Sequence, residues 1–196
     1  GGNTLYLVGD LAFKNDLSNF PDTFTRFRKN VEGNNTVIRQ PFESLSKNNC
    51  KETPKIADEG KLGDLKDFGY YNASINIDKR TQFPFKGGET AALERMNEYI
   101  WNKKSGKNNN PRKAAITHYK ETRNQSIGTE YSSKFSGFLA YGLISPRVIY
   151  HEIKKFEKST GISDINTYWL VFELLWRDFF RFCGMKHGDK IFYEYG

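Results

Sequence analysis

The sequence feature that most constrains the fold is the segment TYWLVFELLWRDFFRF at residues 167–182, which is apolar around nearly its whole circumference when drawn as a helix. Such a pattern is typical of a central, buried helix. Glu173, Arg177 and Arg181 follow one another at helical i, i+4 spacing, so they form one charged stripe. Because buried charges need partners, the stripe is either a structural network, in which Glu173 can pair with Arg177, or the lining of a cavity for a polar, partly anionic ligand that stacks on Trp176.

Composition limits the class of protein. The chain has 196 residues, which fits one domain with its own hydrophobic core. A net charge of +7 with 15% aromatic residues suits a phosphate-bearing partner, and it equally suits a soluble basic protein without one. No apolar run reaches the roughly 18 residues that a membrane-spanning helix needs, so we predict no membrane partner.

The cysteines and the start of the chain bear on the compartment. Cys50 and Cys183 are far apart and belong to no CxxC or Cys/His pattern, which predicts free thiols, an intracellular reducing compartment and no metal site. The chain starts with Gly1 and Gly2 and shows no charged-then-apolar leader. We therefore expect that the chain carries no targeting signal. We also expect either that it is a piece of a longer protein or that extra residues were added at its start.

Residues 1–86 are predicted to form an irregular segment with one short helix. GGNTLYLVGDLAF is expected to contribute a brief extended piece, and FPDTFTRFRKNVEG a short amphipathic helix. That helix would bury Phe24, Phe27 and Val31 on one face and stop at Gly33. Residues 33–65 are polar and rich in turn-forming residues, so we expect them to wrap a neighbouring surface.

Residues 87–196 are predicted to form an all-α bundle. GGETAALERMNEYIWNKK has apolar residues at helical spacing, and the helix in ISPRVIYHEIKKFEKSTG is marked by Ser145 as N-cap, Pro146 at its first position and Gly161 beyond its end. Between these helices, residues 103–123 carry seven Lys/Arg against one acid. This basic run is either a solvated loop or a rim that faces a polyanion.

The segment EYSSKFSGFLAYG combines hydroxyls, an ammonium group and a helix start. Ser132, Ser133 and Ser136 surround Lys134, an arrangement that suits a phosphate cradle and equally suits a serine-rich helix cap. Neither GxxxxGK[ST] nor GxGxxG occurs in the sequence, so the P-loop and dinucleotide-binding folds are excluded as the source of such a cradle.

The segment HYKETRNQSIG places an aromatic and a basic residue one helical turn apart. Tyr119 and Arg123, flanked by Lys120 and Asn124, could stack on bases and contact phosphates at a nucleic-acid rim. An ordinary helix end explains the same pattern.

Together, FKGGETAALERMNEYIW, HYKETRNQSIG, EYSSKFSGFLAYGLISPRVIYHEI and TYWLVFELLWRDFFRF closely resemble the flavin-binding helical domain of the photolyase/cryptochrome family, and DASH cryptochromes in particular. NTLYLVGDLAF and FPDTFTRFRKNVE resemble, more loosely, the segment that leaves the antenna domain of DASH proteins. The resemblance implies FAD as cofactor, damaged or single-stranded DNA as partner, and the deoxyribodipyrimidine photo-lyase reaction. In that reaction blue light drives electron transfer that splits cyclobutane pyrimidine dimers.

The resemblance also assigns roles to residues. It implies cofactor contacts by Tyr119, Ser132, Ser133, Lys134, Phe135, Ser136, Glu173 and Arg177. It implies DNA contacts by Lys120, Arg123, Trp176 and Arg181. Glu173 and Trp176 are the implied catalytic residues: Trp176 as a wall for the flipped dimer, and Glu173 as a carboxyl that stabilises the dimer radical anion.

Two departures from the family pattern qualify these expectations. Gly137 stands where DASH members usually have proline, so we expect a less rigid cradle. The family's domain continues well past the position of Gly196, and an antenna domain precedes it. We therefore expect a longer chain or a second polypeptide to complete the pocket, and the chain alone to be inactive. The alternative is a truncated, flavin-free fragment that acts as a structural or interaction subunit of a larger assembly.

Overall fold

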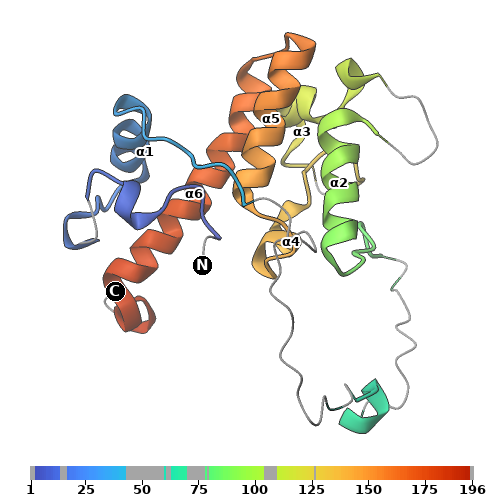
Figure 1. Cartoon of the computed structure of the whole chain (residues 1–196), viewed down its shortest axis with the longest axis horizontal. Helices are drawn as coiled ribbons and strands as arrows, with labels where there is room; N and C mark the ends of the chain where they lie inside the picture. Colours follow the sequence, from blue (N-terminus) through green and yellow to red (C-terminus); the bar gives the residue numbers. More distant parts are fainter. Residues whose placement is uncertain are drawn as a thin grey trace.

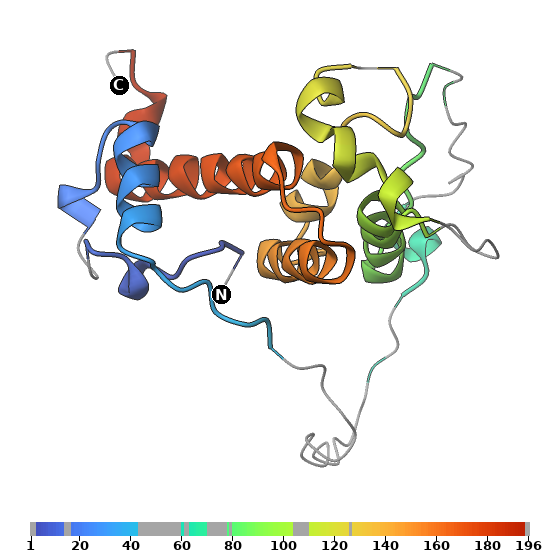
Figure 2. The ribbon, with the colours of Figure 1, turned by 90° about the horizontal axis from the view of Figure 1, so that it is seen from above.

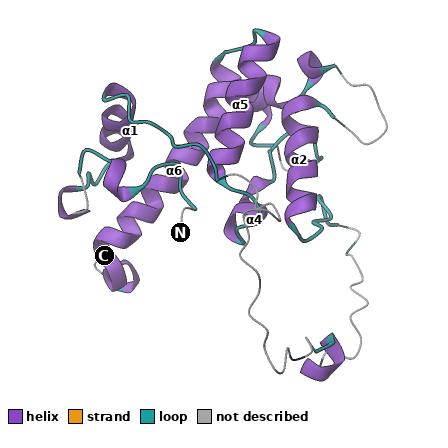
Figure 3. Cartoon of the chain, in the orientation of Figure 1, coloured by secondary structure: helices purple, strands orange, loops and turns teal. Residues whose placement is uncertain are grey.

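The computed structural model describes residues 3–13, 17–42, 60, 63–69, 78, 80–103, 110–125 and 127–194. These residues form helices joined by loops, without strands, as Figure 3 shows, so the prediction of a mainly α fold is confirmed. The extended piece expected near the start is instead a 3₁₀ turn, η1, at Val8–Asp10. None of the described helices is both long enough and apolar enough to cross a membrane.

Helix α6, Ile165–His187, is the central element, as its apolar sequence predicted. It begins with a capping box, in which the Asp164 carboxylate accepts hydrogen bonds from the amides of Asn166 and Thr167, and the Thr167 hydroxyl accepts one from the Asp164 amide. Figures 1 and 2 show that α1 lies on the C-terminal half of α6, while α5 runs along its N-terminal half. One long helix thus joins both parts of the core.

Helix α1, Phe24–Gly33, buries the face predicted from the sequence: Phe24, Phe27 and Val31. Its aromatic rings enter a cluster with those of α6. Phe24 stacks on Trp176 with 3.7 Å between the ring centroids and 9° between the planes. Because these are large rings with extensive contact area, they provide much of the attraction between the two helices.

Helix α5, Pro146–Thr160, packs on α6, and α2 at Glu89–Trp101 packs in turn on α5 and on α4 at Phe135–Ala140. The predicted ends of α5 are confirmed, since Ser145 accepts a hydrogen bond from the amide of Arg147 and Gly161 takes a left-handed conformation with φ of 73°. Helix α2 differs from its apolar pattern at two positions: Arg95 is buried, with 3% of its surface exposed, while Leu93 is partly exposed.

Residues 3–6, called the strap below, are held by an arginine on α5 and an aspartate on α6. Arg147 Nε donates to the carbonyls of Thr4 (3.1 Å) and Leu5 (3.0 Å). Asp178 accepts from the amides of Leu5 (3.1 Å) and Tyr6 (3.0 Å). Each of these two peptide groups thus bridges the buried Arg147 guanidinium and the buried Asp178 carboxyl group. The sequence analysis missed this arrangement, because its groups are about 140 to 170 residues apart in the chain.

Some predictions fall outside the part of the chain that the structure describes. Cys50 and most of the irregular stretch at 43–77 lie there, as does 104–109 of the basic run. Cys183 is a free, half-buried thiol. The division of the chain at residue 86 stays a prediction.

Candidate functional site

The predicted phosphate cradle lies in a loop, residues 129–134, whose carbonyls face α2. The buried Arg95 guanidinium donates to the carbonyls of Thr129 (2.5 Å), Ser132 (3.4 Å) and Ser133 (3.1 Å). The Tyr99 hydroxyl donates to the carbonyl of Tyr131. Four carbonyls of one short loop are therefore fixed by two side chains of α2.

The backbone amides of the same loop remain available. Among the described residues, those of Ser132, Ser133 and Lys134 donate to no other group, and Lys134 has a left-handed φ of 61°. Successive amides beside such a residue form a concave donor set that binds anions. With the Lys134 ammonium and the Ser133 hydroxyl close by, this donor set fits a phosphate group.

Tyr119, at the start of α3 (Tyr119–Thr122), packs beside this loop. Its side chain is buried, and burial raises the pKa of its hydroxyl to about 12. Phe135, the first residue of α4, is also buried, whereas Ser136 is exposed. The structure thus brings Tyr119, Ser132, Ser133 and Lys134 together, while their contact with a cofactor stays a prediction.

The charged stripe of α6 is divided between different partners. Glu173 accepts a 2.7 Å hydrogen bond from Arg123 on the segment that follows α3, and both side chains are about one-third exposed. Arg177 instead donates to the carbonyls of Asn3 and Leu139, and burial lowers the pKa of its guanidinium. The Glu173–Arg177 pair considered from helical spacing is therefore absent from the described contacts. The prediction considered only residues on the same helix, whereas packing brings the carbonyls of Asn3 and Leu139 next to Arg177.

Arg181 is the last residue of the stripe, and Trp176 lies beside the stripe on α6. Phe24 covers one face of the Trp176 ring, and Phe180 stacks at 5.4 Å between centroids. Trp176 keeps partial exposure, and Arg181 is exposed. Their proposed roles with DNA stay predictions.

A basic rim surrounds Trp169, a residue to which the sequence analysis gave no role. Lys120 Nζ lies 4.8 Å from the centre of the Trp169 ring, and Arg123 lies 5.7 Å from it. The indole N–H of Trp169 is buried and has no hydrogen-bond partner among the described residues. An aromatic ring between two cations can stack on a base while the cations contact phosphates.

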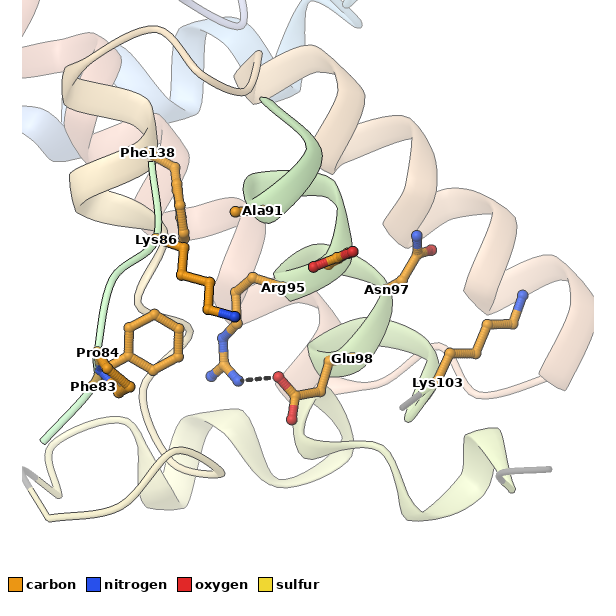
Figure 4. A pocket seen from close by; sticks show the side chains of 10 residues that line it. Phe83, Pro84, Lys86, Ala91, Arg95, Asn97, Glu98, Lys103 and Phe138 are labelled. Carbon is orange, nitrogen blue, oxygen red and sulfur yellow. Dashed lines mark hydrogen bonds and ion pairs between the residues drawn. The ribbon is translucent and has the colours of Figure 1, made fainter. Parts of the chain in front are cut away.

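A pocket of about 690 Å³ is lined in part by Arg95, and Figure 4 shows the Arg95 side chain projecting from α2 with its guanidinium joined to Glu98. Its lining combines apolar and charged residues: Phe83, Pro84, Lys86, Ala91, Glu94, Arg95, Asn97, Glu98, Lys103 and Phe138. No residue of the stripe lines it. The pocket is therefore distinct from the predicted lesion pocket.

The glycine that departs from the family pattern has a packing reason. A Cβ at Gly137 would lie 3.3 Å from the ring of Phe85, which itself packs against Phe138 at 5.4 Å between centroids. A larger residue would require Phe85 to move.

Comparison with known proteins identifies the relatives of this chain. No protein-family model matches it. It is 41% identical to Cryptochrome DASH of Xenopus laevis over 195 residues, all of this chain and 34% of the relative. It is 41% identical to Cryptochrome DASH of Synechocystis (97% of this chain, 35% of the relative) and 38% identical to the chloroplastic/mitochondrial Cryptochrome DASH of Arabidopsis thaliana (98% and 30%).

A solved structure agrees with these relatives. The crystal structure of a Synechocystis cryptochrome matches with a TM-score of 0.81 and 40% identity, over 98% of this chain and 36% of that one. The chain therefore spans about a third of the length of the proteins it matches.

Proposed function

Because the chain is related over its whole length to the DASH cryptochromes of the photolyase/cryptochrome family, we propose that it forms part of a FAD-binding domain that serves light-driven repair of cyclobutane pyrimidine dimers, preferably in single-stranded DNA. The observation that carries this proposal is the free amide set at Ser132, Ser133 and Lys134 beside the buried Tyr119. Such donors suit the pyrophosphate of a dinucleotide.

In the proposed complex, the residues of this chain bind and orient the cofactor. The loop amides and the Lys134 ammonium would hold the two phosphates, and the buried Phe135 and Tyr119 would keep the loop against α2 and α3. When bound, FAD supplies a light-absorbing electron donor, which is chemistry that no side chain provides.

A different set of residues supports contact with DNA. Lys120 and Arg123 place two cations at the Trp169 ring, at a surface that includes Glu173. A phosphate backbone would bind these cations, and a base lifted from the stack would pack against an aromatic ring. Glu173 would lie at the inner edge of this rim, where we propose that its carboxyl contacts the dimer.

The experiment is a spectrum followed by a repair assay. The protein, purified together with the longer chain or second polypeptide that completes its pocket, should show the absorption bands of bound flavin, and under blue light it should restore a single-stranded oligonucleotide that contains a thymine dimer. Lys134→Gln should weaken FAD binding about tenfold, because it removes a charged hydrogen-bond donor. The control Lys158→Gln, an exposed lysine on α5, should bind FAD as the wild type does. Absence of flavin together with absence of repair would contradict the proposal.

A second function is favoured by one observation: Glu173 and Arg177 of the stripe, and Trp176 beside them, already have protein partners. Arg177 is bound to the strap and α4, Glu173 to Arg123, and Trp176 to Phe24. A flavin-free chain that acts as a structural or interaction subunit would need no more than this. The same spectrum separates the two functions, since a structural subunit would purify in stoichiometric complex with a partner and without flavin bands.

A further inference from the structure

A buried arginine and a buried tyrosine on α2 bind the carbonyls of the loop at residues 129–134, and neither has yet been given a role toward a ligand. The Arg95 side chain is 2% exposed, pairs with Glu98 at 3.0 Å, and lies 5.0 Å from the centres of both the Phe83 and Tyr99 rings. Its remaining donors bind carbonyls of the loop at residues 129–134. A planar guanidinium held between two rings keeps its donors in one fixed fork.

Because of the geometry of the peptide group, these carbonyl contacts also fix the direction in which the neighbouring amides point. In a trans peptide the carbonyl of one residue and the amide of the next point in opposite directions, and no described peptide is cis. The carbonyls of Tyr131, Ser132 and Ser133 point to α2, where Tyr99 and Arg95 bind them. The amides of Ser132, Ser133 and Lys134 must therefore point away from α2.

A short polar loop does not keep such a conformation by itself. The left-handed φ of 61° at Lys134 is uncommon for a residue with a side chain, and an unrestrained loop would sample many others. Two side chains anchored on a helix remove that freedom before any ligand binds, so less of the binding free energy is lost to ordering the loop.

We propose that Arg95 and Tyr99 are positioning residues that fix the amides of Ser132, Ser133 and Lys134 in a preformed site for a pyrophosphate group. This inference rests on the proposed flavin function and assigns the anion-binding step to backbone orientation set from α2. Neither side chain touches the ligand.

The test measures two ligands on the whole protein: FAD by fluorescence titration, and inorganic pyrophosphate as its competitor. Tyr99→Phe removes one hydroxyl, and Arg95→Lys keeps the charge but loses the planar fork. Each substitution should weaken the binding of both FAD and pyrophosphate about 3- to 10-fold, the range expected for one or two lost hydrogen bonds. Glu98→Gln, which removes the ion pair and leaves the carbonyl contacts, should change both affinities less than about twofold.

The outcomes separate this inference from the proposed function. Wild-type protein that binds no FAD would refute both. Wild-type protein that binds FAD, with Tyr99→Phe unchanged for both ligands, would overturn the positioning role alone. A variant that binds FAD more weakly but binds pyrophosphate as the wild type does would also overturn it. Such a loss would reflect a general loosening of the fold and not a change in the amides that bind the phosphates. Should Arg95→Lys fail to fold, as judged by circular dichroism, Tyr99→Phe decides the question.

Discussion

The buried carboxylate of Asp178 should make the stability of this protein depend on pH in an unusual direction. Burial raises the pKa of Asp178 from its usual 3.8 to about 7, and this outweighs the amides of Tyr6 and Leu5 and the guanidinium groups of Arg177 and Arg147, all of which lower it. The folded protein therefore keeps a proton on Asp178 that the unfolded chain releases.

The sign and the size follow from linkage. Below about pH 4 both states bind the proton, so Asp178 does not favour unfolding there. As pH rises from about 4 to about 7, the unfolded state gains the free energy of ionisation first, and the free energy of unfolding falls. A pKa difference of about three pH units at ~1.4 kcal/mol each makes this loss ~4 kcal/mol, after which the contribution of Asp178 is constant.

The assay is urea denaturation of wild type and Asp178→Asn at several pH values between about 4 and about 8. Asparagine does not titrate, so the stability advantage of the wild type over Asp178→Asn should shrink by up to ~4 kcal/mol as pH rises. Asp189→Asn, which removes an exposed carboxylate just beyond α6, is the control, and its difference from wild type should stay within ~0.5 kcal/mol throughout. An Asp178 difference that instead grows with pH would show that the amides and guanidinium groups outweigh burial, and would refute the reasoning.

Three further predictions concern packing, charge and backbone. Phe24→Ala should lower the free energy of unfolding by about 3 to 4 kcal/mol, because it removes the ring that covers one face of Trp176. The control Phe180→Ala, at a ring that is 64% exposed, should lower it by less than half as much. Equal losses would contradict the packing argument. A double-mutant cycle of Arg123→Gln and Glu173→Gln should give a coupling of only about 0.5 to 1 kcal/mol, because both groups are about one-third exposed, and a coupling well above that would mean a more desolvated pair. Gly161→Ala should cost about 1 kcal/mol in thermal or urea denaturation, because φ there is 73°, and a neutral result would show that α5 ends differently.

Much of the helical framework could be predicted because its signals are local. The ends of α5 follow from Ser145, Pro146 and Gly161, each of which acts on backbone groups within one turn. The buried face of α1 and the central place of α6 follow from apolar spacing alone.

The candidate site could be predicted only in part. The serine-rich loop and Tyr119 were found from residue types, and the structure brings them together. The part played by Arg95 could not be found, because a charged residue in an amphipathic helix is usually exposed, and only packing against Phe83 and the loop shows that this one is buried. Lys120 and Arg123 were predicted as a rim from the sequence, but Trp169 beside them was missed, because it comes from another helix.

The sequence by itself determined where the helices lie and which of their faces are apolar, because hydrogen bonds and caps within a helix depend on residues a few positions apart. The tertiary structure alone decided which charges meet. Arg177 binds the strap and not Glu173, Glu173 binds Arg123, and Asp178 holds amides more than 170 residues away in sequence. Those pairings depend on which polar groups packing brings within hydrogen-bond distance in a desolvated interior, and no spacing along the chain contains that information.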